Sequence, residues 1–131
     1  MIRENLKAGV NLWTYTAYIL NRFGERNGYS DMKFKELSEF IFDNLWRKQH
    51  LVFHDGKEDL MCDLRYLDKI KVIKLEEYSP DIDKSNIYLG NRTILKKASE
   101  KIEESALRTG LKLFDEYKEK IDSAFEQIKK L

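Results

Sequence analysis

The stretch Leu60–Gly90 reads LMCDLRYLDKIKVIKLEEYSPDIDKSNIYLG and changes its hydrophobic period part-way along. Its first part carries leucines at the spacing i, i+4, i+7, which is the apolar stripe of a short helix that buries one face. Asp55 and Gly56 form a turn pair ahead of it, and either residue can cap a helix. Two acidic residues in the first turn suit the positive end of the helix dipole. The pattern predicts a helix over about Lys57–Lys69.

The second part of this stretch alternates with a period of two from Val72 to Tyr78, as a half-buried strand does. Ser79-Pro80-Asp81 then supplies turn chemistry, and Asn86–Leu89 is a second β-prone run before Gly90. The pattern predicts a β-hairpin that follows the helix directly.

The residues Asp63–Ile73, DLRYLDKIKVI, resemble a phrase of the winged helix-turn-helix family, D-L-x-x-L-x-x-x-x-[IV]-[IL], which closes the third helix and opens the wing. Lys71 replaces the glycine that is usual before the strand. Upstream, KELSEFI at Lys35–Ile41 resembles the family's second helix, commonly written E-L-[AS]-x-x-[LIF]. The resemblance implies a mostly α fold with a wing of two or three strands. The expected architecture is similar to that of small archaeal and bacterial transcription regulators that dimerise through terminal helices.

Composition bounds the class of protein. Apolar residues at 42% and aromatic residues at 12% exclude a disordered chain, while 36% charged residues exceed the usual share of about a quarter. The formal net charge of +1 gives no global attraction to nucleic acid or membrane. A single cysteine, Cys62, permits no internal disulfide. No apolar run approaches the ~20 residues that cross a bilayer, so we expect a cytoplasmic protein.

Two further helices are predicted ahead of this stretch. An apolar helical stripe covers Leu6–Phe23 and ends at the glycines of Gly24–Ser30. We expect its aromatic residues in the core or at a subunit interface, rather than around an effector pocket. Ser30 or Asp31 can cap a second helix. The sequence leaves open whether Phe42–Gly56 continues that helix or forms an inserted loop.

The C-terminal segment contains no proline and predicts one helix from Asn91 or Thr93 to Leu131. Forty residues at the helical rise would span roughly 60 Å, longer than a small domain is wide. We therefore expect a winged-helix domain over 1–91 and a dimerisation helix over 92–131, with Gly110 permitting a kink. An alternation of three and four residues indicates a coiled-coil seam, whose simplest partner is a second copy of the chain. The seam positions are Phe114, Tyr117, Ile121, Ala124, Ile128 and Leu131.

By resemblance, the third helix would enter the major groove of double-stranded DNA. Arg65 suits guanine because its fork matches two acceptors, and Tyr66 suits a phosphate or a thymine methyl. Lys69 would complete the reading face, while phosphates would be held by Arg47, Lys48, Lys57, Lys84 and Asn86. The side chains expected to point away from the leucine stripe are Glu58, Asp59, Cys62, Asp63, Arg65, Tyr66 and Lys69.

The acidic residues of the same region favour an alternative. Five basic and eight acidic residues lie between Glu58 and Asn91, a balance of −3 where a DNA reader would carry a surplus of Lys and Arg. A winged helix can serve instead as a protein-interaction module, with the acidic helix face and the coiled coil as its binding surfaces.

Other chemistry finds little support in the sequence. His50 and His54 lie four residues apart beside Asp55, but the apolar residues between them indicate a plug into the core rather than a metal site. Cys62 near Arg65 is a conceivable redox sensor, although a lone cysteine on a short helix is more often inert. No Gly-rich phosphate loop and no Gly-x-Ser-x-Gly turn is present. We expect no metal, no cofactor and no enzymatic activity.

Overall fold

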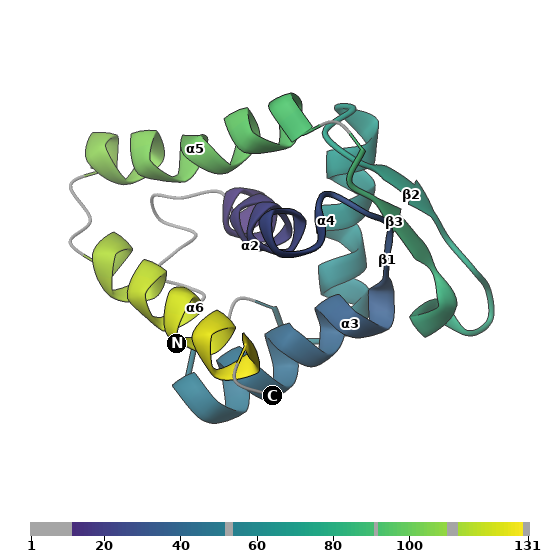
Figure 1. Cartoon of the computed structure of the whole chain (residues 1–131), viewed down its shortest axis with the longest axis horizontal. Helices are drawn as coiled ribbons and strands as arrows, with labels where there is room; N and C mark the ends of the chain where they lie inside the picture. Colours follow the sequence, from purple (N-terminus) through teal and green to yellow (C-terminus); the bar gives the residue numbers. More distant parts are fainter. Residues whose placement is uncertain (1–11, 52–53, 91, 110–112, 130–131) are drawn as a thin grey trace.

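The computed structural model describes residues 12–51, 54–90, 92–109 and 113–129. Within these ranges the chain is mostly helical, with a small three-stranded antiparallel sheet. In Figure 1, α2 (Leu12–Asn27) lies in the middle of the molecule, with α5 (Arg92–Thr109) along its upper side and α6 (Leu113–Lys129) below. The sheet lies at the opposite end from α6. In the described parts of the chain, no helix has the length and apolarity that crossing a membrane requires.

The helix and hairpin expected from the central stretch are both present. Helix α4 covers Lys57–Lys69, and its leucine stripe is fully buried. Strand β2 (Lys74–Glu76) pairs antiparallel with β3 (Asn86–Tyr88), and the short 3₁₀ helix η2 (Ile82–Lys84) lies between them. The change of period from helical to alternating therefore predicted the local structure correctly.

The third strand, β1, is only two residues long, Met32–Lys33. It pairs antiparallel with the other edge of β3, so the sheet order is β1-β3-β2. The N–H of Phe34 donates to the carbonyl of Ser85 at 2.9 Å, which extends this edge into the next helix. Two residues are too few to show a period of two, so the alternation alone does not reveal this strand.

The second helix changes its hydrogen-bonding pattern part-way along. Helix α3 covers Phe34–Glu39 and continues as a π-helix, η1, over Phe40–Lys48. In a π-helix the bonds join residues five apart, so Phe40 and Leu45 lie on one face, and both are buried. Trp46, the residue after Leu45, is 41% exposed. Of the segment that the sequence left open, Phe42–Lys48 is thus helical, while residues 50, 51 and 54–56 lie in neither a helix nor a strand.

The first helix extends further than expected. Residues 6–11 of the expected helix lie outside the described residues, but α2 continues through Gly24 to Asn27. A Cβ atom at Gly24 would lie 2.5 Å from Cδ1 of Tyr29, so this glycine makes room for the tyrosine ring. Gly28, at φ +70°, is the residue that ends the helix. The helix therefore ends within Gly24–Ser30, as expected, but the prediction that it stops at Phe23 is wrong.

The prediction of one long C-terminal helix is also wrong. Two helices, α5 and α6, take its place, and Figure 1 shows α6 turned back beside the rest of the chain. Residues 110–112, which include Gly110, lie outside the described ranges. Leu95 and Ala98 of α5 and Ile121 of α6 belong to the same apolar core as the leucines of α4. The segments on either side of Asn91 therefore share one core.

The expected coiled-coil positions pack within their own chain. Tyr117, Ile121 and Ala124 are buried, and Ile128 packs partly against the core. The ring of Phe125 lies 5.0 Å from that of Phe23 and 4.3 Å from that of Phe40. Leu131 and the side chain of Phe114 lie outside the described residues. An intramolecular partner avoids the entropy cost of association, so the stripe is buried against α2 and η1.

Candidate nucleic-acid interface

The outer face of α4 and the β2–β3 hairpin form one surface, which we name the α4–hairpin face. Opposite the leucine stripe, α4 exposes Glu58, Cys62, Arg65 and Lys69, which follow one another at helical spacing. Arg65 reaches across to Glu77 at the end of β2. Because of this contact, the hairpin lies alongside the exposed side of the helix.

Arg65 is held by two carboxylates. Its Nη2 donates to Oε1 of Glu77 at 2.8 Å and to Oε1 of Glu58 at 3.2 Å, and its Nε donates to Glu77 at 3.1 Å. The hydrogen bond from Arg65 lowers the pKa of Glu77, and the same bond raises the pKa of Arg65. In the free protein, the positive charge of the guanidinium that was expected to contact guanine is therefore balanced by carboxylates. It must exchange a carboxylate for any nucleic-acid acceptor.

Lys57, the first residue of α4, is neutralised in a similar way. Its Nζ lies 3.0 Å from Oδ1 and 3.2 Å from Oδ2 of Asp83 in η2, which joins the start of the helix to the hairpin. A cleft of about 300 Å³ borders this pair, and Lys35 and Ser38 line its other side. Both partners are partly exposed, and ion pairs of this kind contribute about 1 kcal/mol or less. Phosphate oxygens can therefore compete for the lysine.

The remaining expected contacts on α4 differ from one another. Lys69 is exposed in the last turn of the helix. Tyr66 is exposed, but its ring centroid lies 5.5 Å from that of Trp13, so it lies toward the start of α2. Lys69 is thus available on the outer face, while Tyr66 lies at its edge.

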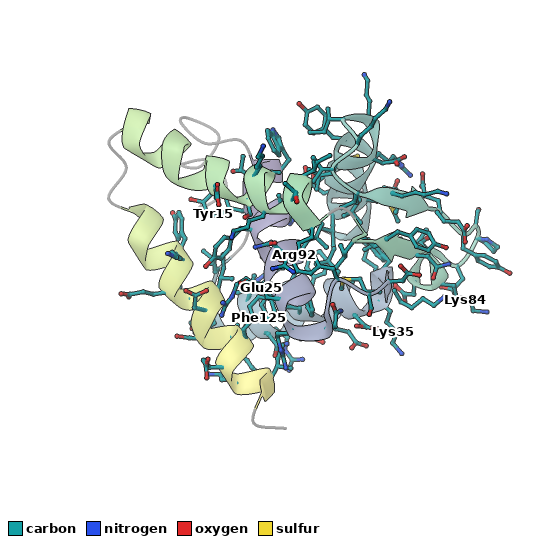
Figure 2. The ribbon with its side chains drawn as sticks, turned by 45° about the horizontal axis from the view of Figure 1, so that its top comes forward. Tyr15, Glu25, Lys35, Lys84, Arg92 and Phe125 are labelled. Atoms are coloured by element: carbon teal, nitrogen blue, oxygen red, sulfur yellow. The ribbon has the colours of Figure 1, made fainter. Side chains whose placement is uncertain are left out.

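The hairpin positions also have partners. Figure 2 shows Lys84 at the far end of the hairpin, and its Nζ lies 5.8 Å from the ring centroid of Tyr78. Asn86 donates to Glu76 at 3.0 Å and accepts from Lys33 at 2.7 Å. The ammonium of Lys84 therefore lies beside the Tyr78 ring, whereas the amide of Asn86 links the three strands.

Arg47 and Lys48 are not part of the α4–hairpin face, although Arg47 pairs with a residue that lines the cleft beside Lys57. Both are on η1, where Arg47 is within 3.6 Å of Asp43. Lys48 lines a cleft of about 320 Å³ together with Phe23 and Ile128, so it lies next to α6. We expected Lys48 to act together with Lys57 and Arg65, but it lies next to α6 instead, whereas Arg47 contacts a residue of the same cleft as Lys57.

Beneath the face, a buried polar network anchors α4. Nε2 of His54 lies 2.6 Å from Oδ2 of Asp63, and the hydroxyl of Thr16 donates to the same oxygen at 3.0 Å. Because a carboxylate only accepts, Nε2 carries the proton. His54 is 1% exposed, and among the described residues its Nδ1 has no hydrogen-bond partner. The network fixes the segment before α4 to both α4 and α2.

Sequence reasoning missed this network. We expected Asp63 on the exposed face and considered His54 with His50 as metal ligands, yet His50 is exposed and His54 is in the core. Within the described ranges, no group of three or more His, Cys, Asp or Glu side chains is placed to hold a metal ion. The three partners are 9, 38 and 47 residues apart, beyond any local sequence pattern.

No family model, curated protein or solved structure matches this chain. The functional argument therefore depends on the geometry of the chain itself.

Proposed function

We propose that this chain is a winged helix-turn-helix protein that binds double-stranded DNA and regulates transcription. Helix α4, followed directly by the β2–β3 hairpin of a three-stranded sheet, supports this proposal, because the resemblance implies a third helix that runs into a wing of two or three strands. The observation that carries it is the Arg65–Glu77 contact, which places the hairpin beside the exposed side of α4. A helix enters the major groove, while the hairpin reaches the flanking backbone.

Binding then proceeds by exchange of partners. Arg65 and Lys57 leave their carboxylates for base or phosphate acceptors, while Lys69 and Lys84 have no such pair to break among the described residues. Because the released carboxylates remain close to the DNA, we expect modest affinity with a steep dependence on salt. The carboxylates of Glu58, Glu77 and Asp83 compete with DNA for these two cations. We expect only a duplex with well-placed acceptors to displace them.

The test is fluorescence anisotropy with a labelled random duplex over a series of salt concentrations. The logarithm of the binding constant should fall with that of salt by about 0.9 per phosphate neutralised. Arg65→Ala should weaken binding and, if Arg65 contacts a phosphate, reduce that slope by about one. Lys97→Ala, an exposed lysine on α5, is the matched control and should leave the slope unchanged. Equal binding by wild type and Arg65→Ala would contradict the proposal.

A second candidate is a winged helix that binds another protein. The observation that favours it is the pairing of Arg65 with Glu58 and Glu77, which leaves carboxylates on both sides of the cation. Such a face suits a basic partner through complementary charge. Failure to bind any duplex at low salt would favour this function over DNA binding.

The homodimer remains part of the proposal and is tested separately. Since Tyr117, Ile121 and Ala124 are buried in their own chain, a second copy would have to pair through another surface. Sedimentation of the wild-type protein should give the mass of two chains, and the mass of one chain would contradict the dimer.

A further inference from the structure

A second cationic region lies away from the α4–hairpin face. A cleft of about 520 Å³ separates the end of α2 from the start of α5. Arg92 and Lys96 of α5, one helical turn apart, line one side, and Glu25 and Tyr29 line the other. In Figure 2, Arg92 and Glu25 lie close together near the centre of the view, far from Lys84 at the end of the hairpin.

The two cations of this cleft share it with one carboxylate, that of Glu25. The guanidinium carbon of Arg92 lies 5.7 Å from the ring centroid of Tyr29, whose hydroxyl donates to Asn21 at 2.8 Å. Within the described ranges, neither Arg92 nor Lys96 forms an ion pair, whereas Glu25 is within 3.8 Å of Arg22. The cleft thus differs from the α4–hairpin face, where carboxylates hold Lys57 and Arg65.

The backbone around the cleft leaves room for a ligand. Gly28 and Gly90 both line it, and a Cβ atom added to either would meet nothing within 4 Å. A ligand can therefore approach the main chain closely at these two points. Across Gly90, a neighbouring cleft of about 440 Å³ is lined by Lys71 and Lys74 together with Asp68, so two further cations lie along this surface.

We propose that the cleft between α2 and α5 binds a phosphate group through Arg92 and Lys96. Guanidinium donors in a fork match two phosphate oxygens, and an ammonium one turn away adds a second charge. The phosphate belongs either to a small phosphorylated molecule or to a nucleic-acid backbone. This site does not depend on the function proposed for the α4–hairpin face.

The test uses inorganic phosphate as the probe, titrated against chloride at constant ionic strength. Amide resonances of Gly28 and Gly90 should shift and saturate in the wild-type protein. In Arg92→Ala/Lys96→Ala the dissociation constant should rise about tenfold or more, since two charge-assisted contacts are lost. Lys97→Ala, one residue along the same helix, should stay within about twofold of wild type because its charge lies outside the cleft. Lys96→Gln removes one charge but keeps the Arg92–Tyr29 contact. It replaces the double variant in the test if the double variant fails to fold.

Shifts that never saturate in the wild type, or that saturate in Lys96→Gln at the same phosphate concentration as in the wild type, would overturn the site. Binding of a labelled duplex distinguishes the two sources of the phosphate group. If it is a nucleic-acid backbone, phosphate displaces the duplex and Arg92→Ala/Lys96→Ala weakens duplex binding. If it is a small molecule, the double variant binds duplex as wild type does, while phosphate still saturates the wild-type cleft. Arg65→Ala should leave phosphate binding unchanged in either case.

Discussion

Helices α4 and α6 are alike in sequence and differ in what their apolar stripes contact. Each carries large apolar residues at helical spacing and a charged opposite side, and each stripe is buried in the common core. For α4 the sequence predicted the bounds, the buried leucines and the hairpin that follows. For α6 it predicted a second chain as the partner, yet the stripe packs on α2 and η1. A stripe shows that a face is buried but does not identify its partner.

Sequence separation explains the difference. The hairpin that flanks α4 begins five residues after the helix ends, so its place follows from local geometry. The partners of α6 lie far upstream: the hydroxyl of Tyr18 donates to Asp122, 104 residues away, at 2.8 Å. Tyr18 and Asp122 fix α6, as Thr16, His54 and Asp63 fix α4. Substitutions in these two groups of hydrogen-bonded residues, in the apolar stripe of α6 and on the exposed side of α4 test the comparison between the two helices.

The largest expected effect is that of Ile121→Lys in α6. Ile121 is fully buried, so a lysine there places an unpaired charge in the core and should cost about 3 kcal/mol or more. Thermal melting followed by circular dichroism should show a chain that unfolds early or does not fold. Glu119→Lys, exposed on the same helix, should change stability by about 0.5 kcal/mol or less. A folded Ile121→Lys that only loses a dimer would restore the coiled-coil reading.

His54→Ala should have the next largest effect, because it removes the anchor of α4. The carboxylate of Asp63 loses a buried donor, at a cost of about 1–3 kcal/mol. Denaturant unfolding of His54→Ala, Asp63→Ala and the double variant should show that the two losses are not additive. His50→Ala, at an exposed histidine of the same segment, is the control and should be nearly neutral. Additive losses would mean that the pair does not hold α4.

Tyr18→Phe should have a smaller effect, about 0.5–1.5 kcal/mol, through loss of the hydrogen bond to Asp122. Burial, and then this bond, raise the pKa of Tyr18 above its ordinary value of 10.0. Its contribution is therefore complete below about pH 10 and is lost as the pH rises through the raised pKa. Unfolding measured from neutral to alkaline pH should show a shallower fall for Tyr18→Phe than for wild type. Parallel curves would mean that this bond does not anchor α6.

Glu77→Gln should have the smallest effect on stability and a visible one on binding. The pair with Arg65 is exposed, so its loss should cost about 1 kcal/mol or less. Because Arg65 no longer needs to leave a carboxylate, duplex affinity should rise several-fold and fall more steeply with salt. Glu119→Gln removes the same charge from α6 and serves as the control in the anisotropy assay. Equal affinities for the two variants would mean that Glu77 does not compete with DNA for Arg65.

The sequence by itself determined the local elements around Leu60–Gly90. Period and turn chemistry were sufficient for α4 and the hairpin, because both depend on residues within a few positions of one another. The excess of acidic over basic residues in this stretch was also visible in the sequence, but the pairing of Arg65 and Lys57 with particular carboxylates was not. Exposure of Arg65 and Lys69 followed from the position of the leucine stripe.

Only the tertiary structure decided which distant residues meet. The two-residue strand β1, the Thr16–His54–Asp63 network and the Arg92–Tyr29 contact join segments that no period relates. The packing partner of α6 was also decided only by the tertiary structure, since burial of an apolar stripe against any complementary surface lowers the free energy of the protein. Hydrophobic burial is non-directional, so the chain's own α2 and η1 satisfied the stripe that a second copy was expected to cover.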